Sequence, residues 1–229
     1  MSNFVHLHLH TSYSLLDSSI RHEPLIKRAA EFGMPAVAMT DHGNMFGAVE
    51  FYNTAKKHGV KPILGCEVYV APESRHEKKS KDNLRDASYH LILLCENDTG
   101  YKNLLRLITK GYLEGFYYKP RIDKELLAEY SEGLIALSSC IRGEVAHNVN
   151  RENVPRATKV AAQYAEIMGP NNFFLELQNH GLENQDRINN DIVGIGKKLD
   201  IPIVATTNCH SLDKKDFRAH EILLCLQTG

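Results

Sequence analysis

The stretch Phe4-Val5-His6-Leu7-His8-Leu9-His10-Thr11 alternates apolar side chains with histidines. Period-two alternation predicts a half-buried β-strand, with the leucines on one face and the imidazoles on the other. Side chains two residues apart on a strand are separated by roughly 6.6 Å, so neighbouring imidazoles can reach one metal ion or two adjacent ions. A lone histidine in a strand is more often a hydrogen-bonded polar residue. Three in alternation, followed by Thr11 and Asp17, predict a metal site.

The composition of the whole chain is that of a soluble globular protein. Its 229 residues, 43% hydrophobic and 24% charged, suffice for one α/β barrel or two small domains. The net charge of −1 argues against a strongly basic nucleic-acid module, although bound divalent ions would add positive charge. No apolar run approaches about 18 residues and no signal peptide opens the sequence, so we expect a cytoplasmic protein without membrane contact. The five cysteines lack Cys-x-x-Cys spacing and fit reduced thiols.

Beyond the first stretch, strand-like apolar runs alternate with amphipathic helical patterns. We predict further strands at residues 35–40, 61–65, 89–95, 133–138, 172–177 and 201–206. Helices are predicted at residues 23–32, 45–57, 100–113 and 183–199, with helical patterns up to 168 and a last helix near the C-terminus. Residues 72–88 are charged and without periodicity, which predicts an exposed, mobile loop. This alternation of strands and helices predicts a parallel α/β sheet, either open or closed into a barrel.

Polar residues that can bind metal follow several of these strands. At or just beyond predicted strand ends lie His10, His42, Glu67, Cys140, Asn208 and His210. We favour a barrel because its strand ends converge on one face, where chemistry takes place. His90 is the exception, since it lies at the start of its strand; that strand either begins earlier or runs differently.

Each candidate also has an alternative role. Asp41 would orient an imidazole instead of binding metal, and Cys140 in isolation is more often a small buried hydrophobe. We expect His6 to be a hydrogen-bonded core residue, and Glu176 and His180 to line the site without binding metal. The remaining histidines are expected at the surface: His22, His58, His76, His147 and His220.

Three motifs together resemble a known family. Residues 4–17 (FVHLHLHTSYSLLD), 40–47 (TDHGNMFG) and 62–67 (PILGCE) are similar to the PHP (polymerase and histidinol phosphatase) superfamily. Within it, residues 115–123 (GFYYKPRID), 174–177 (FLEL) and 219–229 (AHEILLCLQTG) resemble the N-terminal PHP domain of bacterial DNA polymerase III alpha subunits more than the free phosphatases. The resemblance implies an α/β fold, a distorted (β/α)7 barrel of the PHP type. It further implies that residues 1–229 are a single PHP domain and an N-terminal fragment of a larger replicative polymerase.

The resemblance also implies a polynuclear metal site. Carried over position by position, the family's metal-site residues are His8, His10, Asp17, His42, Glu67, His90, Cys140, Asn208 and His210. They would hold two to three divalent ions, zinc, manganese or iron, and act catalytically through those ions. The mixture of imidazole, carboxylate and thiol donors suits zinc or manganese better than magnesium. Asn208 departs from the family, which usually has aspartate there, and the lost carboxylate predicts a weaker site.

Three functions compete at this point. The first is metal-dependent phosphodiester hydrolysis of the 3′–5′ exonuclease type, proofreading a DNA primer 3′ end within a replicase. The second is a catalytically silent domain, stabilised by metal, that supports the remainder of the polymerase alpha subunit and docks a separate proofreading exonuclease subunit. The third is a free phosphomonoesterase of the histidinol phosphatase type, against which the replicase-like residues 219–229 argue.

Overall fold

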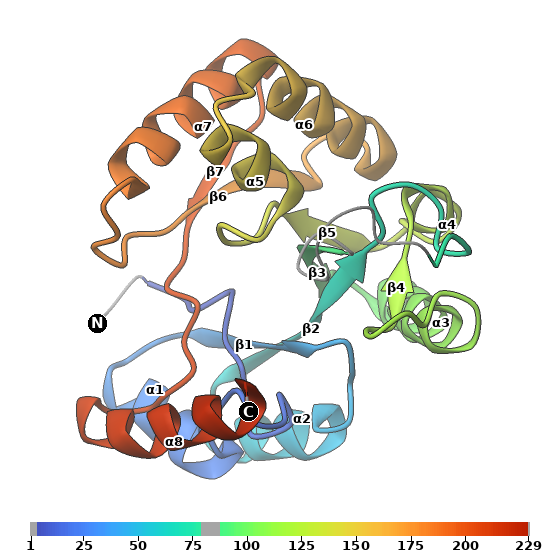
Figure 1. Cartoon of the computed structure of the whole chain (residues 1–229). Helices are drawn as coiled ribbons and strands as arrows, with labels where there is room; N and C mark the ends of the chain where they lie inside the picture. Colours follow the sequence, from blue (N-terminus) through green and yellow to red (C-terminus); the bar gives the residue numbers. More distant parts are fainter. Residues whose placement is uncertain (1–3, 79–87, 229) are drawn as a thin grey trace. The chain divides into compact units, whose positions relative to one another are not determined.

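The computed structural model describes residues 4–78 and 88–228, and its chain trace is drawn in Figure 1. The chain divides into two compact units. Unit 1 comprises Met1–Cys66 and Thr207–Gly229, and unit 2 comprises Glu67–Thr206. The division falls within strand β2 (Lys61–Val70), whose first six residues belong to unit 1 and whose last four belong to unit 2.

Unit 1 is built on two helices and a strand that share a hydrophobic core. In chain order it contains α1 (His22–Glu31), β1 (Ala36–His42), α2 (Ala48–Lys57), the start of β2, the 3₁₀ helix η2 (Lys214–Asp216) and α8 (Phe217–Thr228). Helices α1 and α2 contact each other, and α1 also contacts β1. The core between them includes Leu9, Ile26, Val37, Met39 and Phe51, each 1% exposed or less. Burial of these side chains is the main force that holds unit 1 together.

The histidine-rich stretch at residues 4–11 is extended but does not form a regular strand. Its one bridge pairs Leu9 with Cys209 in parallel. On one side His6 and Leu9 accept hydrogen bonds from β1, and on the other His10 donates to the Cys209 carbonyl at 2.9 Å. The segment therefore lies between β1 and residues 207–210. From His8 onward both faces are buried, so the predicted half-buried strand was wrong: Leu9 packs into the hydrophobic core, and the His10 ring packs against the rings of His42 and His210.

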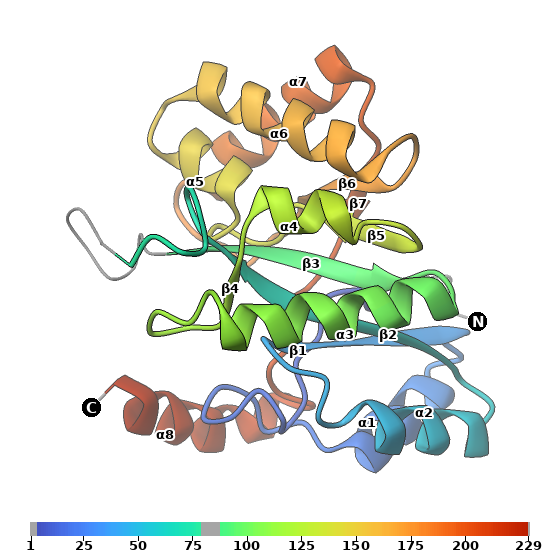
Figure 2. The same ribbon diagram turned by 90° about the vertical axis from the view of Figure 1, so that its right-hand side faces the viewer.

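Unit 2 holds the remaining strands and helices. It contains the end of β2, β3 (Tyr89–Cys95), α3 (Asp98–Leu113), β4 (Arg121–Ile122), α4 (Lys124–Glu129), β5 (Leu134–Leu137), α5 (Glu144–Asn150), α6 (Val154–Met168), β6 (Phe173–Leu177), α7 (Gln185–Leu199) and β7 (Ile203–Ala205). The strand order is β2-β3-β5-β6-β7, with β4 paired to β2. Helices α5, α6 and α7 gather beside β6 and β7, as both views show (Figures 1 and 2), while α3 packs near β3, β4 and β5.

One strand pair departs from the predicted parallel sheet. The pairs β5–β6 and β6–β7 are parallel, but β3 pairs antiparallel with β5, with Ile92 opposite Leu137. An antiparallel strand brings its first residues to the edge where its partner ends. His90 at the start of β3 therefore lies near the residues that follow β5. This explains why His90 lies near residues at strand ends although it begins its own strand.

Local sequence explains where several helices begin. The side chains of Asn97, Asp123 and Asn153 accept hydrogen bonds from the first-turn amides of α3, α4 and α6, respectively. These residues satisfy donors that a helix start leaves without an intrahelical partner, which is why asparagine and aspartate are preferred there.

The loop predicted at residues 72–88 falls partly outside the described residues, which omit 79–87. The part that is described is anchored at Arg75. Its guanidinium contacts Asp123 at 3.0 Å and Glu114 at 2.8 Å, and only 13% of its side chain is exposed. The predicted exposure was wrong at this residue, because two buried or half-buried carboxylates contact its guanidinium.

Candidate metal centre

Three imidazoles of unit 1 converge on one place. His10 comes from the 4–11 segment, His42 ends β1, and His210 follows the bridge residue Cys209. One nitrogen from each ring lies within 4.8 Å of the others. The His10 ring stacks against each of the other two, with centroid distances of 4.2 Å to His42 and 4.3 Å to His210, and the centroids of those two rings lie 6.2 Å apart. Residues from three distant parts of the sequence thus present nitrogen donors to a single point.

Asp17 joins two of these imidazoles through one carboxylate oxygen. Nε2 of His42 lies 2.7 Å from Asp17 Oδ2, and Nε2 of His210 lies 3.3 Å from the same atom. Burial alone would raise the pKa of Asp17, but hydrogen bonds and charge from His210 and His42 hold that pKa well below its usual range. The cluster therefore combines three nitrogen donors with an ionised carboxylate.

A buried network of hydroxyls fixes the His10 ring. Ser14 Oγ lies 2.9 Å from His10 Nδ1 and donates to Asp41 Oδ1 at 2.8 Å. The Asp41 carboxylate also accepts hydrogen bonds from the amide and the hydroxyl of Thr11, at 2.6 and 2.7 Å. Asp41 thus orients an imidazole, as predicted, but through Ser14. The sequence analysis missed Ser14, although its position between the histidine stretch and Asp17 was the signal that could have identified it.

His8 and Asn208 lie beside this cluster within unit 1. The His8 ring is 5.3 Å from that of His10, and His8 is fully buried. Asn208 has a left-handed backbone, with φ of 45°, a conformation that asparagine tolerates better than most residues. Its Oδ1 is buried and makes no hydrogen bond to any residue in the described part of the chain. A buried oxygen in that state costs free energy unless something binds it.

The second group of predicted ligands lies in unit 2. His90 Nδ1 is 2.8 Å from Glu67 Oε1, which also accepts a 2.7 Å hydrogen bond from Ser139 Oγ. Ser139 has a left-handed φ of 66° and precedes Cys140. Burial raises the pKa of the Cys140 thiol to about 12, and the nearby Glu67 charge adds to the effect. Glu67, His90, Ser139 and Cys140 thus lie where β5 ends and β3 begins.

Other histidine predictions were mixed. His6 is hydrogen-bonded, as expected, with its Nδ1 2.7 Å from Thr207 Oγ1, but it is half-buried and not the core residue that was predicted. His22 is 3% exposed, so its expected surface position was wrong: it is the first residue of α1, whose apolar face turns inward onto Phe51. His220 on α8 was not expected near the site, yet its Nε2 lies 2.9 Å from the Asp17 carbonyl oxygen. No sequence signal pointed to it.

Glu176 and His180, both in unit 2, were expected to line the metal site without binding metal, and this stays a prediction. Glu176 is 2% exposed, and its Oε1 accepts hydrogen bonds from Thr206 and Gln178. His180 is linked to the same network through its Nε2, 3.2 Å from Gln178 Oε1.

Among the described residues, no helix is long and apolar enough to cross a membrane.

This α/β fold is that of a recognised class. The family model described as PHP domain matches residues 6–180, and the chain belongs to the PHP domain family. Its sequence is 45% identical over 228 residues to DNA polymerase III subunit alpha of Borreliella burgdorferi, and 46% identical over 227 residues to that of Thermus aquaticus. The alignments cover 100% and 98% of this chain but only 20% and 18% of those relatives. The chain therefore spans about a fifth of the curated relatives that it matches.

Solved structures share the fold at low sequence identity. A protein from Bifidobacterium adolescentis, proposed to be a metal-dependent phosphoesterase, superposes with a TM-score of 0.55 at 12% identity, covering 97% of each chain. A two-domain protein from Bacteroides vulgatus that contains a predicted PHP-like metal-dependent phosphoesterase gives 0.56 at 13% identity, covering 90% of this chain and 52% of that one. The α/β fold of the PHP type that the sequence predicted is thereby confirmed.

The donors in unit 1 fit a divalent transition metal. Imidazole suits zinc, iron and related ions, whereas magnesium prefers oxygen donors and keeps several waters. Three ring nitrogens within 4.8 Å of one another and an ionised carboxylate match the ligands that zinc and iron prefer. The buried Asn208 Oδ1 adds a neutral oxygen donor. Because metal ligands with fixed orientation bind more tightly, the Ser14 contact to His10 and the Asp17 contact to His42 also support this assignment.

Proposed function

We propose that this chain is the PHP domain of a bacterial DNA polymerase III alpha subunit and that it hydrolyses phosphodiesters in a metal-dependent, 3′–5′ exonuclease-type reaction. The observation that carries the proposal is the convergence of His10, His42 and His210 on one point. The alignment with DNA polymerase III alpha subunits covers nearly all of this chain, which supports a role within a replicase. The substrate would be the 3′ end of a DNA primer, and the compartment the cytoplasm.

The proposed metal ligands are the nine family positions named from the sequence. Within unit 1 they are His8, His10, Asp17, His42, Asn208 and His210, and within unit 2 Glu67, His90 and Cys140. Two to three ions of zinc, manganese or iron would occupy them. When bound, such ions polarise a phosphoryl oxygen and neutralise the charge that develops on it during hydrolysis.

The side chains themselves prepare the site. Asp17 holds the His42 and His210 rings through a shared oxygen, and Ser14 holds the His10 ring against the Asp41 carboxylate. Fixed rings lose little freedom when a ligand binds, which favours a well-defined geometry for catalysis. Burial of His8 and His10 excludes bulk water from the inner side of the cluster.

A second function is favoured by one observation. Asn208 replaces a charged ligand with a neutral one, which weakens attraction for hard or borderline cations. A domain that keeps metal for stability, supports the remainder of the polymerase and docks a separate proofreading exonuclease subunit would tolerate this loss. The free phosphomonoesterase has less support, because the curated relatives described above are polymerase subunits.

A labelled-primer assay separates these functions. The purified chain, supplied in turn with zinc, manganese or iron, is incubated with single-stranded DNA labelled at its 5′ end. We expect stepwise shortening from the 3′ end, lost in His42→Ala and retained in His76→Ala, which alters an exposed histidine. Metal binding without shortening in any of the three metals would favour the structural domain. Shortening at equal rates in His42→Ala would contradict the proposed site.

A further inference from the structure

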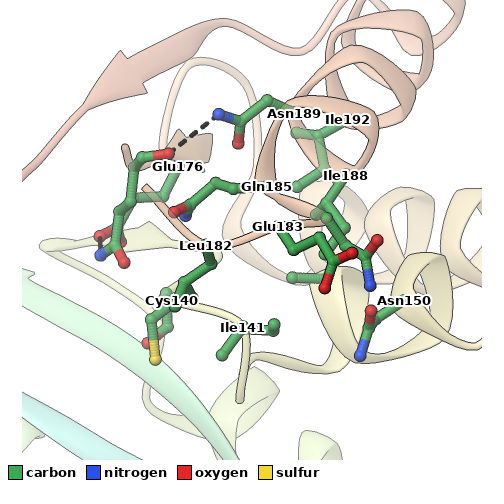
Figure 3. Close-up of a pocket in the computed structure, with 14 residues that line it drawn as sticks. Cys140, Ile141, Asn150, Glu176, Leu182, Glu183, Gln185, Ile188, Asn189 and Ile192 are labelled. Atoms are coloured by element: carbon green, nitrogen blue, oxygen red, sulfur yellow. Dashed lines mark hydrogen bonds between the residues drawn. The ribbon is translucent and has the colours of Figure 1, made fainter. Parts of the chain in front are cut away.

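Unit 2 contains a pocket of about 180 Å³ beside Ser139 and Cys140. Figure 3 shows Cys140 and Ile141 on one side of it, and Ile188 and Ile192 of α7 on the other. Typical pockets for drug-sized ligands are roughly 300–1,000 Å³, so this one suits a single ring system better than a dinucleotide.

The charge of the pocket excludes phosphate. Two carboxylates, those of Glu176 and Glu183, line it, and among the described residues no lysine or arginine side chain does. Arg187, the cation that follows at the start of α7, instead contacts the Val149 carbonyl at 3.2 Å and Asp191 at 3.6 Å. An anionic group placed in the pocket would lie close to two carboxylates, and like charges repel. The pocket therefore favours a neutral ligand.

Two carboxamides present a donor and an acceptor of fixed orientation. Gln185 Oε1 accepts a hydrogen bond from the His180 amide at 2.8 Å, so its NH₂ group is the part that can donate to a ligand. Asn189 Nδ2 donates to the Gln178 carbonyl at 2.9 Å, a bond drawn in Figure 3, so its Oδ1 is the part that can accept. Each nucleobase offers a hydrogen-bond donor next to an acceptor on its pairing edge.

The apolar walls complete the match. Ile141, Leu182 and Ile188 line the pocket with flat aliphatic surface, and Leu182 and Ile141 are themselves 52% and 39% exposed. Covering such surface with the face of a planar ring would remove apolar area from water at about 25 cal/mol per Å². A planar, neutral ring with an adjacent donor and acceptor matches the two carboxamides and the aliphatic side chains of the pocket.

We propose that this pocket receives the nucleobase of the terminal nucleotide of the substrate. The inference rests on the proposed function, since it names the part of a nucleic-acid strand that unit 2 holds. Ser139 links the pocket to the predicted ligands, because it lines the pocket and donates to Glu67 at 2.7 Å. Recognition through one donor and one acceptor is tolerant of sequence, as removal of any terminal nucleotide requires.

The test uses an isosteric change. Gln185→Glu keeps the oxygen that accepts from His180 but replaces the NH₂ donor with a carboxylate oxygen. Asn190→Asp is the matched control, because it adds a carboxylate to the same helix at an exposed residue outside the pocket. Binding of 2′-deoxyadenosine and thymidine to the metal-free chain is measured by NMR, with deoxyribose 5-phosphate and inorganic phosphate as base-free probes.

Both nucleosides should bind the wild type and Asn190→Asp, and Gln185→Glu should weaken that binding about fivefold to a hundredfold. The base-free probes should not shift resonances of Ile188 or Leu182. Absence of nucleoside binding at 10 mM, or equal binding by Gln185→Glu, would overturn the pocket's assignment even if the chain degrades DNA. Conversely, nucleoside binding at Ile188 without DNA hydrolysis in any metal would refute the proposed activity and leave the pocket assignment standing.

Discussion

Asn208 is a proposed metal ligand whose side chain cannot ionise. Its Oδ1 is buried and makes no hydrogen bond to another described residue, and its backbone is left-handed. Non-glycine residues in that conformation are uncommon and cluster at functional sites. An amide oxygen here is placed to bind a cation but contributes no charge.

We predict that Asn208→Asp increases metal affinity about tenfold or more, which corresponds to roughly 1.4 kcal/mol. The added carboxylate supplies a negative charge, and aspartate tolerates the same left-handed backbone. Titration of manganese or zinc followed by calorimetry measures the affinity, with Asn208→Ala expected to bind more weakly than the wild type. Equal affinities in the wild type and the aspartate variant would show that Asn208 does not bind the ion.

His22 predicts a pH dependence separate from the metal. Its side chain is 1% exposed, and burial lowers its pKa from 6.5, an effect that Glu50 and Asp41 only partly oppose. Because the unfolded chain then binds a proton more readily than the folded one, stability decreases as the pH falls below about 6.5. The free energy of unfolding is measured with denaturant at pH 7.5 and at pH 5.5, in the presence of chelator. Between these two pH values it should decrease less for His22→Gln than for the wild type. The same loss in both proteins would rule out His22 as its source.

At the scale of elements, the sequence predicted most helices and strands because their apolar spacing is local information, but it gave no prediction for the short helix α4 or the short strand β4. The strands at 35–40, 89–95, 133–138 and 172–177 appear as β1, β3, β5 and β6 within two residues of the predicted ends. The antiparallel direction of β3 was not predictable, since side-chain alternation is the same in both directions. For the same reason the contact of His90 with Glu67 followed only from the structure.

The site was predictable in its residue types but not in its supporting contacts. Alternating histidines followed by Asp17 predicted a metal site at His8 and His10, and the family resemblance completed the nine ligand positions, which stay predictions. Long-range contacts such as that of His220 to the Asp17 carbonyl, 203 residues apart, leave no local pattern. Such contacts depend on tertiary packing, which leaves no periodic pattern in a single sequence.

Alanine substitutions at two glycines test how closely α3 approaches Gly133 within unit 2. A Cβ at Gly100 would lie 1.7 Å from the Gly133 carbonyl oxygen, whereas a Cβ at Gly194 on α7 would have no atom within 4 Å. We predict that Gly194→Ala stabilises unit 2 by about 0.5–1 kcal/mol, and that Gly100→Ala destabilises it by more than that. Urea unfolding measures both changes. Similar stabilities for the two variants would contradict the close approach of α3 to Gly133.

At the scale of the whole molecule, metal should contribute to stability. His10, His42 and His210 come from segments up to 200 residues apart, and an ion bound only by the folded arrangement stabilises it by mass action. At a free metal concentration of 100 Kd this amounts to about 2.7 kcal/mol, or about 5–10 °C in melting temperature. Excess chelator added to a metal-loaded sample should therefore lower the melting temperature, and a chelator-independent melting curve would contradict the clustered site.

The most direct measurement of the central claim is the metal content of the chain after gel filtration. The wild type, His10→Ala and His76→Ala are each incubated with zinc, manganese or iron, separated from free metal, and analysed by elemental mass spectrometry. We predict at least one ion per chain in the wild type and in His76→Ala, and a loss of about one ion or more in His10→Ala, since His10 lies at the centre of the stacked imidazoles. A wild type that retains none of the three metals, or a His10→Ala variant that retains as much as the wild type, would contradict the claim that this cluster binds metal.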